Sequence, residues 1–401
     1  MNYYYYNRYY PNDILVFIEE INRGENIVIF DFLDSNELEK FNTSLKIQGD
    51  IFKASMVRIT NYRQKNIREN TVYAINLDLL LSLRLNIESI EDSYLFGYNL
   101  RLPNKIDLLF KTSVSINEED RYDIGAIVNG GATDNILDIS LRGNIDVTVR
   151  NIGQGNWNEV YANDEIKAVY DAGAPTNATK TVVRQHIGNK VNEYTNSKPP
   201  LILSHWDKDH YHSLVGMSNS ELQCFSSFIC PEIRPNITSR ILYGRIEQAI
   251  GRNNIYTVSN IPKVRGNPPT LGLISPSGNN FMIFNSTYNK DRNQSGIVVA
   301  IKTNTSSIIL PGDAHYTLLS NCILPILNHT HLHNLVVPHH GGNGGAYNYN
   351  MYPGTTSGQA VISVGTNRYG HPKTAYKRAL TLDRFQVLST QKVGSDITIS
   401  L

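Results

Sequence analysis

Apolar residues along this chain form short runs separated by polar loops. In the front part, runs at 26–33 and 50–60 are typical of strands, and residues 76–90 have the apolar spacing of a helix. A polar, glycine-rich passage at 125–135 is the best candidate for a junction. We therefore expect a smaller mixed α/β domain of unknown role at residues 1–140.

After this junction the runs become shorter and more apolar. Runs at 146–152 and 166–172 indicate strands, and a helical pattern follows at 178–190. Near-continuous apolar runs, which are typical of strands covered on both faces, are found at 200–204, 281–285, 295–303, 307–311, 334–338 and 360–364. Residues 141–401 are therefore predicted to form a second α/β domain.

Charge and histidine are unevenly divided between these two parts. Residues 1–140 carry 14 Lys+Arg and 21 Asp+Glu, a net charge of −7, whereas residues 141–401 carry a net charge of +8. All 11 histidines lie between His186 and His371. The basic part favours a polyanionic substrate, and the acidic part suits docking of a protein partner or of a second copy of the chain.

Other features of the sequence exclude whole classes of protein. The chain opens with MNYYYYNRYYPND, which has no apolar core of a secretory signal. No apolar stretch approaches the ~20 residues of a membrane helix, and three cysteines cannot make a disulfide framework. We expect a cytoplasmic protein without membrane association.

The strongest chemical signal is the segment SHWDKDH at residues 204–210. It follows a predicted buried strand and contains His205, Asp207, Asp209 and His210. Imidazole and carboxylate ligands together suit Zn²⁺, Mn²⁺ or Fe. A tight loop points alternate residues in different directions. These four side chains are therefore expected to form two half-sites, His205 with Asp207 and Asp209 with His210. Taken alone, the segment is also compatible with an ordinary solvated turn.

Three further polar clusters follow apolar strands in the same way. Asp313 lies in LPGDA, His339 and His340 lie in VPHHGG, and His371 lies in RYGHP. Singly, each has a plain structural interpretation as a helix cap, a polar loop or a turn. Because loops after strand ends converge in α/β proteins, we expect one shared site in which Asp313 bridges two ions.

Together these motifs resemble the metallo-β-lactamase superfamily, and within it the C-terminal metallo-β-lactamase-like domain of the competence protein ComEC. The resemblance covers about residues 145–401 and implies an αββα sandwich with a two-metal hydrolytic centre at one edge. Nothing comparable is found for residues 1–140. The matching segments are NIGQGN, YDAG, SHWDKDH, NQSGIVVAI, LPGDA, VPHHGG, SVGTNRYGHP and the tail at 384–401.

The resemblance implies a role for individual residues. Asp171 corresponds to an aspartate that supports the metal loop. A further His ligand, usual between that loop and the bridging aspartate, is missing, since no His lies between 213 and 314. The first ion is therefore expected to be weakly held, of a harder type, or completed by water. The implied ligands are His205 and Asp207 for the first ion, Asp209, His210 and His371 for the second, and Asp313 for both.

The same resemblance indicates the residues that act on the substrate. His339 or His340 would face the substrate phosphate as proton donor or charge stabiliser, and Asp209 is counted with them as catalytic. Lys208 and Arg368 are candidates for contacts to the substrate.

The resulting hypothesis is a metal-dependent hydrolase that uses one or two divalent ions, Zn²⁺ or Mn²⁺, with Mg²⁺ as an alternative. The favoured activity is that of a phosphodiesterase or nuclease on DNA or another nucleotide polyanion, by metal-activated water. Two alternatives remain open. One is hydrolysis of a lactone, thioester or β-lactam on the same fold, and the other is a metal-degenerate binding subunit of a larger complex.

Overall fold

The chain divides into two compact units, Met1–Asn129 with Ile233–Gly244, and Gly130–Glu232 with Arg245–Leu401. A segment from the middle of the sequence thus belongs to the front unit, which the expected division at residue 140 did not anticipate. The glycine-rich passage at 125–135 lies outside the described residues. The computed structural model describes residues 12–47, 55–62, 66–83, 85–103, 110–111, 139–275, 279–289, 291–327, 331–349, 351, 355–367 and 369–401.

The first unit is built on a seven-stranded sheet in the order β5-β6-β3-β2-β1-β4-β7. Helices α1 (Ser35–Ser44) and α2 (Leu77–Ser82) contribute Phe41 and Leu80 to a core that also contains Phe30 and Phe32. The strands are β1 (Asp13–Asn22), β2 (Ile27–Phe32), β3 (Met56–Thr60), β4 (Val72–Asn76), β5 (Asn86–Ser89), β6 (Phe96–Arg101) and β7 (Phe110–Lys111).

One prediction for this unit is wrong in part. The helical pattern at 76–90 forms a helix only as far as Ser82, and Asn86–Ser89 form strand β5. This strand pairs antiparallel with β6, where Ile87 lies opposite Leu100. Backbone pairing along a sheet edge therefore overrides the local apolar spacing.

Helix α7 (Ile237–Ile250) begins in the first unit and ends in the second. Its first turn is part of the core of the first unit, where Ile237 is buried. The backbone N–H of Thr238 donates to Asp31 Oδ2 at 3.1 Å, and the side-chain amide of Asn236 donates to Glu19. Two acidic side chains are thus buried in this unit together with the inserted segment.

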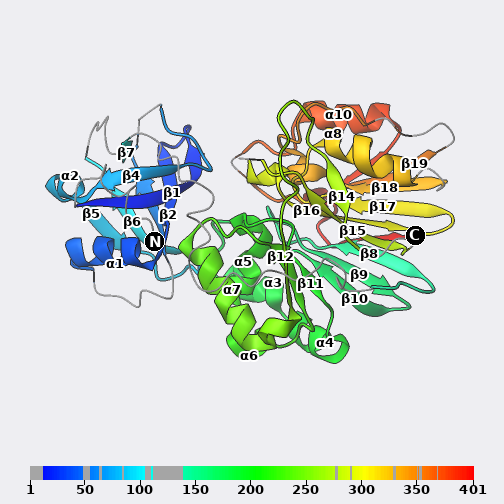
Figure 1. Ribbon diagram of the computed structural model, residues 1–401, viewed down its shortest axis with the longest axis horizontal. Coiled ribbons are helices and arrows are strands. Elements are labelled where there is room, and N and C mark those ends of the chain that lie inside the picture. Colours follow the sequence, from blue (N-terminus) through cyan, green and yellow to red (C-terminus); the bar gives the residue numbers. More distant parts are fainter. Residues whose placement is uncertain are drawn as a thin grey trace. The chain divides into compact units, whose positions relative to one another are not determined.

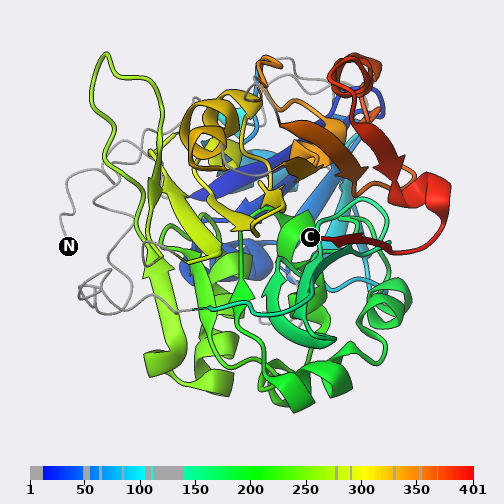
Figure 2. The same ribbon diagram turned by 90° about the vertical axis from the view of Figure 1, so that its right-hand side faces the viewer.

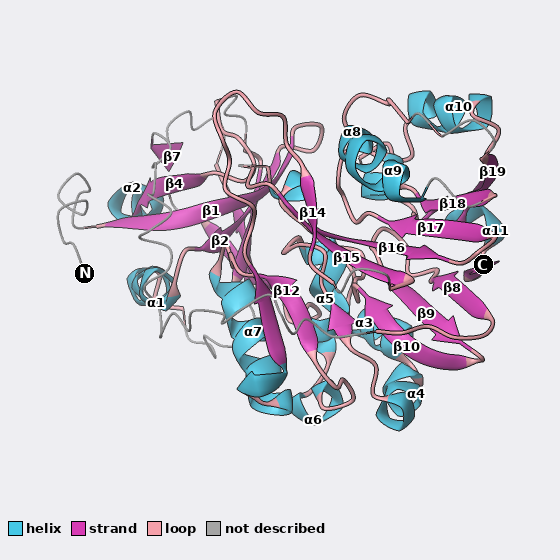
Figure 3. Ribbon diagram, turned by 45° about the vertical axis from the view of Figure 1, so that its right-hand side comes forward, coloured by secondary structure: helices cyan, strands magenta, loops and turns pink. Residues whose placement is uncertain are grey.

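The second unit is an αββα sandwich, as the sequence predicts. Two seven-stranded sheets lie face to face, in the orders β13-β12-β11-β10-β9-β8-β21 and β14-β15-β16-β17-β18-β19-β20. Helices α3, α4 and α5 lie on the outer side of the first sheet, and α8 and α10 lie on the outer side of the second (Figures 1 and 3).

Where the sequence predicts a strand in this unit, a strand is found within a few residues of it, whereas six further strands (β9, β12, β13, β14, β20 and β21) were not predicted. The first sheet contains β8 (Ile145–Val149), β9 (Asn158–Ala162), β10 (Glu165–Tyr170), β11 (Leu201–Ile202), β12 (Phe228–Pro231), β13 (Ile255–Val258) and β21 (Ile397–Ser400). The second contains β14 (Leu271–Leu273), β15 (Phe281–Ser286), β16 (Ile297–Lys302), β17 (Ser306–Leu310), β18 (Leu332–Val336), β19 (Thr356–Ile362) and β20 (Gln386–Ser389). The helices are α3 (Lys180–Ile187), α4 (Lys190–Ser197), α5 (Lys208–Gly216), α6 (Asn219–Leu222), α8 (Tyr316–Leu318), α9 (Leu324–Leu327), α10 (Thr374–Leu382) and α11 (Thr390–Val393).

Strand β16 shows why the apolar runs of this unit are nearly continuous. Ile297, Val299 and Ile301 belong to the core between the two sheets. Val298 and Ala300 point the other way, into the core under the helices on the outer side. Because side chains alternate between the faces of a strand, a strand buried on both faces must be apolar at every position.

Parallel pairing places the chemistry at one edge of each sheet. Strands β10 to β13 run parallel to one another, as do β17 to β20. The carboxyl ends of parallel neighbours meet at the same edge, so the loops that follow them lie close together. The last strand, β21, returns to the first sheet and pairs with β8 (Figure 2). In the described parts of the chain, every helix is too short or too polar to cross a lipid bilayer.

Candidate metal centre

Loops after several strand ends bring most of the predicted ligands together in the second unit. The loop after β11 supplies His205, the first turn of α5 supplies Asp209 and His210, the loop after β17 supplies Asp313, and the turn after β18 supplies His340. Two groups of ligand atoms each lie within 4.8 Å of one another: His205, His210 and Asp313, and Asp209, His210 and His340.

Asp171 does not belong to either ligand group but holds neighbouring residues of the site by hydrogen bonds. It is fully buried at the end of β10, with a left-handed φ of 59°. Its carboxylate accepts hydrogen bonds from the Ser204 backbone N–H at 2.6 Å and from the Asn156 side chain at 2.7 Å. It also accepts one from His210 Nδ1 at 2.8 Å. The carboxylate therefore fixes the start of the histidine loop and one ring of the site.

The Ser204 hydroxyl decides which ring nitrogens face the site. The hydroxyl group donates its hydrogen to Asp171 Oδ2 at 2.8 Å. Its oxygen lies 3.0 Å from His205 Nδ1 and 3.1 Å from His210 Nδ1. Because its only hydrogen points to Asp171, it accepts from the imidazoles, and we assign the proton of each ring to Nδ1. Among the described residues, none hydrogen-bonds to Nε2 of either histidine. When the two rings are neutral, the lone pair of each Nε2 is thus directed into the site.

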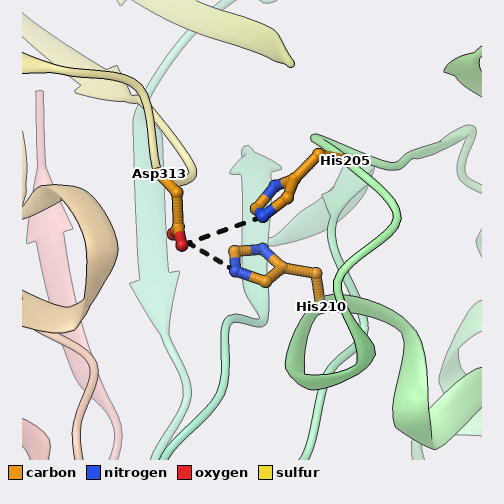
Figure 4. Close-up of side chains that lie close together, drawn as sticks. All are labelled: His205, His210 and Asp313. Carbon is orange, nitrogen blue, oxygen red and sulfur yellow. Dashed lines mark ion pairs between the residues drawn. The ribbon is translucent and has the colours of Figure 1, made fainter. Parts of the chain in front are cut away.

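Asp313 lies opposite both imidazoles. Its Oδ1 is 3.2 Å from His210 Nε2 and its Oδ2 is 3.7 Å from His205 Nε2 (Figure 4). The loop that carries it contains Gly312, whose φ of 56° is the left-handed conformation that glycine adopts without strain. A β-carbon at Gly312 would come within 2.9 Å of Ser204 Oγ. The close approach of the two loops therefore depends on this glycine.

The turn after β18 gives the two adjacent histidines different positions. His339 and His340 have φ values of 51° and 53°, which is uncommon for residues other than glycine. The Nδ1 of His340 donates to the Ser363 carbonyl at 2.8 Å, so its Nε2 faces Asp209 Oδ2 at 3.3 Å. His339 is more open, with 22% of its side chain exposed, and its Nδ1 is 3.5 Å from Asp313 Oδ2. The structure thus places His340 among the ligand candidates, a position that the sequence did not reveal.

Buried charges in the site hold one another in ionised form. Burial raises the pKa of Asp209, but the neighbouring His340 and His210 outweigh burial and lower the pKa to about 2. Burial also opposes ionisation of Asp313, yet the neighbouring histidines keep its pKa well below the usual range. Burial lowers the pKa of His210, but Asp313 and Asp171 raise it well above its usual value. Without a cation, this histidine carries the compensating proton.

These residues fit a divalent cation. Within the described chain, the Nε2 atoms of His205, His210 and His340 and the Oδ1 of Asp313 are buried and lack hydrogen-bond partners. Leaving several such polar atoms unsatisfied in one place is costly. Neutral imidazoles and carboxylates are ligands for Zn²⁺ and Mn²⁺. A cation in either group would satisfy the atoms of that group and displace their protons.

His371 is a predicted ligand that falls outside the two ligand groups. His371 lies with Nδ1 3.4 Å from Gln154 Nε2, and its ring centre is 5.4 Å from that of His339. Burial and the charges of His339 and His340 lower the pKa of His371 to about 4. Lys208 is buried in the first turn of α5. Arg368 lies outside the described residues.

Asp207 also falls outside the two ligand groups, although its Oδ2 lies 3.5 Å from His205 Nε2. Its other oxygen has a partner that the sequence reasoning missed. Asp207 occupies the N-cap position of α5, yet its side chain makes no capping hydrogen bond. Its Oδ1 lies 3.0 Å from Nε of Arg292. Burial raises the pKa of Asp207, but Arg292 and His205 outweigh burial and lower it far below the usual range. The available signal was the arginine in the loop before β16, within the stretch between residues 213 and 314 that contains no histidine.

Comparisons with known proteins add little to this picture. No family model matches the chain, and no curated protein matches its sequence. Among solved structures, it is similar to CmlA, a diiron β-hydroxylase from Streptomyces venezuelae, at 9% identity and a TM-score of 0.36, covering 65% of this chain and 55% of CmlA. A mutant of the same enzyme gives 10% identity, a TM-score of 0.36 and coverages of 64% and 54%.

A third similar structure is a long form of RNase Z from yeast, at 10% identity and a TM-score of 0.33, covering 59% of this chain and 39% of that one. The chain thus spans about half the length, or less, of the solved structures it resembles. We therefore base the function on the geometry of the site.

Proposed function

We propose that this protein is a metal-dependent hydrolase that cleaves phosphodiester bonds in DNA or another nucleotide polyanion. The observation that carries the proposal is the convergence of buried imidazole Nε2 atoms and the Oδ1 atom of Asp313, which have no hydrogen-bond partners among the described residues. Such an arrangement is stable only when something positively charged satisfies it.

Asp209, His210 and His340 are the residues that would hold the cation, with Asp313 Oδ1 3.2 Å from His210 Nε2. When bound, a divalent cation lowers the pKa of water and neutralises charge on a phosphoryl oxygen. Asp171 and Ser204 keep His210 in the tautomer that presents Nε2. The chain itself therefore supplies orientation, because supporting hydrogen bonds fix His210 and His340 before any cation arrives.

His339 is suited to deliver a proton to the leaving oxygen. It is the more exposed of the two adjacent histidines. The Asn293 amide lies 3.1 Å from its Nδ1 and can only donate there, which leaves the ring proton on Nε2. A histidine with a defined N–H next to the cation ligands meets the geometric requirement for a general acid.

The choice of a nucleotide polyanion rests on charge and on the sequence resemblance. Residues 141–401 carry a net charge of +8, which favours polyanions through steering and release of counterions. The motifs between residues 151 and 372 are those that resemble the ComEC domain. Neither the positive charge nor the resemblance favours a lactone, a thioester or a β-lactam as the substrate.

The test is an activity screen on the full chain, stripped of metal and reloaded with Mn²⁺, Zn²⁺ or Mg²⁺. Substrates are single- and double-stranded DNA, RNA, and a chromogenic phosphodiester, with nitrocefin and a lactone as the contrasting set. We expect metal-dependent cleavage of phosphodiesters only. Cleavage restricted to nitrocefin or the lactone would support the alternative hydrolase, and no activity with no bound metal would support a binding subunit.

A further inference from the structure

His210 belongs to both ligand groups but cannot bind a cation in both at once. Both include its Nε2, and its other nitrogen is bound to Asp171 at 2.8 Å. One ring nitrogen offers one lone pair and binds one cation. An ion held with Asp209 and His340 therefore leaves only His205 and a shared Asp313 for a second ion, unless Asp207 contributes.

Asp207 is already neutralised by a side chain of the protein. The Arg292 Nε atom is 3.0 Å from Asp207 Oδ1, and both side chains are largely buried, with 15% and 22% exposed. A cation bound to Asp207 would lie close to this guanidinium. Like charges repel strongly where water is excluded, so the guanidinium disfavours a dication at this half-site.

Arg292 is held in this position by its surroundings. Its Nη1 donates to the Trp206 carbonyl at 3.1 Å. It begins a short 3-10 turn, Arg292–Gln294, whose N-cap Asp291 accepts from the Asn293 backbone N–H at 3.1 Å. The side chain is thus anchored at the backbone and at the guanidinium, as a built part of the site would be.

We propose that the site holds a single divalent cation, on Asp209, His210 and His340 with Asp313 Oδ1 next to His210 Nε2, and that the Arg292 guanidinium takes the place of a second cation beside His205 and Asp207. This inference rests on the metal-binding part of the proposed function and replaces the two-ion centre that the resemblance implies. The arginine supplies a positive charge on the Asp207 side of the site at every metal concentration.

The experiment measures bound metal per chain by mass spectrometry and by titration with Mn²⁺ and Zn²⁺. The full-length protein is compared with Arg292→Gln, with the charge-conserving Arg292→Lys, and with Arg265→Gln, an exposed arginine away from the site. We expect one ion in the unaltered protein, in Arg292→Lys and in Arg265→Gln. In Arg292→Gln we expect two ions, because Asp207 is released.

Two ions in the unaltered protein, or one ion in Arg292→Gln, would overturn the inference. If Arg292→Gln does not fold, Asp207→Asn gives a second test, because we expect it to keep one ion whereas loss of an ion would identify Asp207 as a ligand. Absence of metal from every variant would overturn both this inference and the proposed function. One ion without phosphodiester cleavage would leave the inference standing and remove the proposed substrate class.

Discussion

His210 Nδ1 lies 2.8 Å from Asp171 Oδ2, and both side chains are completely buried. This contact joins the end of β10 to the first turn of α5 and leaves only Nε2 of His210 for the site. A carboxylate behind a metal-binding histidine orients the ring and raises its basicity. The predictions below test the consequences of this arrangement.

Replacing Asp313 by Asn should reduce metal content and abolish hydrolysis. Asp313 is the carboxylate that faces both His205 and His210, and an amide oxygen lacks its charge. We expect a loss larger than the roughly 10- to 100-fold that follows removal of a merely supporting residue. Metal analysis and the phosphodiester assay measure it, with Asp164→Asn in an exposed turn as the control. Normal metal content in Asp313→Asn would contradict the assignment.

Replacing Ser204 by Ala should weaken metal binding without removing any ligand. The hydroxyl fixes Nδ1 as the protonated nitrogen of His205 and adds to the support of His210. We expect the dissociation constant for Mn²⁺ to rise about 10- to 100-fold. Calorimetric titration checks this, with the exposed Ser395→Ala as the matched control. An unchanged dissociation constant in a folded variant would show that the hydroxyl has no role in orienting the rings.

Metal binding should strengthen as the pH rises. The pKa values of His210 and His340 are raised despite burial, because Asp313, Asp171 and Asp209 lie beside them. A cation must displace these protons, so affinity falls as the pH drops through the raised pKa values. Titration calorimetry between about pH 6 and pH 8, in buffers of different ionisation heat, should show proton release. A pH-independent affinity with no proton release would refute this.

Stability of the first unit should fall as the pH rises. Burial and the charge of Glu19 raise the pKa of Asp31 to about 7 from 3.8. The folded form therefore binds this proton more tightly than the unfolded form, and the stabilisation is lost between about pH 4 and pH 7. Its upper bound is on the order of 4 kcal/mol. Denaturant unfolding of the full chain across this range measures it, and Asp31→Asn should flatten the dependence. If the free energy of unfolding of Asp31→Asn changed with pH as steeply as that of the unaltered protein, another group would cause the pH dependence.

Residues 141–401 expressed alone should be less stable than the full chain. The segment Ile233–Gly244 would lose the unit to which it belongs, exposing Ile237 and leaving Asn236 and Thr238 without Glu19 and Asp31. We expect aggregation and increased binding of a hydrophobic dye. Light scattering and dye fluorescence measure these, and a monodisperse fragment with full-chain stability would show that the segment is self-sufficient.

Many strands could be predicted from the sequence because a buried segment must consist of apolar residues. A strand such as β16 must be apolar at every position when both faces are covered, and the runs in the second unit follow this rule. The helix expected at 76–90 failed in its second half because pairing of β5 with β6 depends on residues that are distant from that window.

The motifs fixed the kinds of ligand atom and the loops that carry them. Histidine and aspartate residues directly after apolar strands indicated a metal site, because parallel strands deliver their carboxyl ends to one edge. Local sequence did not show that His340 would join Asp209, that Ser204 would set the ring tautomers, or that Arg292 would pair with Asp207. Each of these depends on contacts between loops that are far apart along the chain, and only the packing of the two sheets brings those loops together.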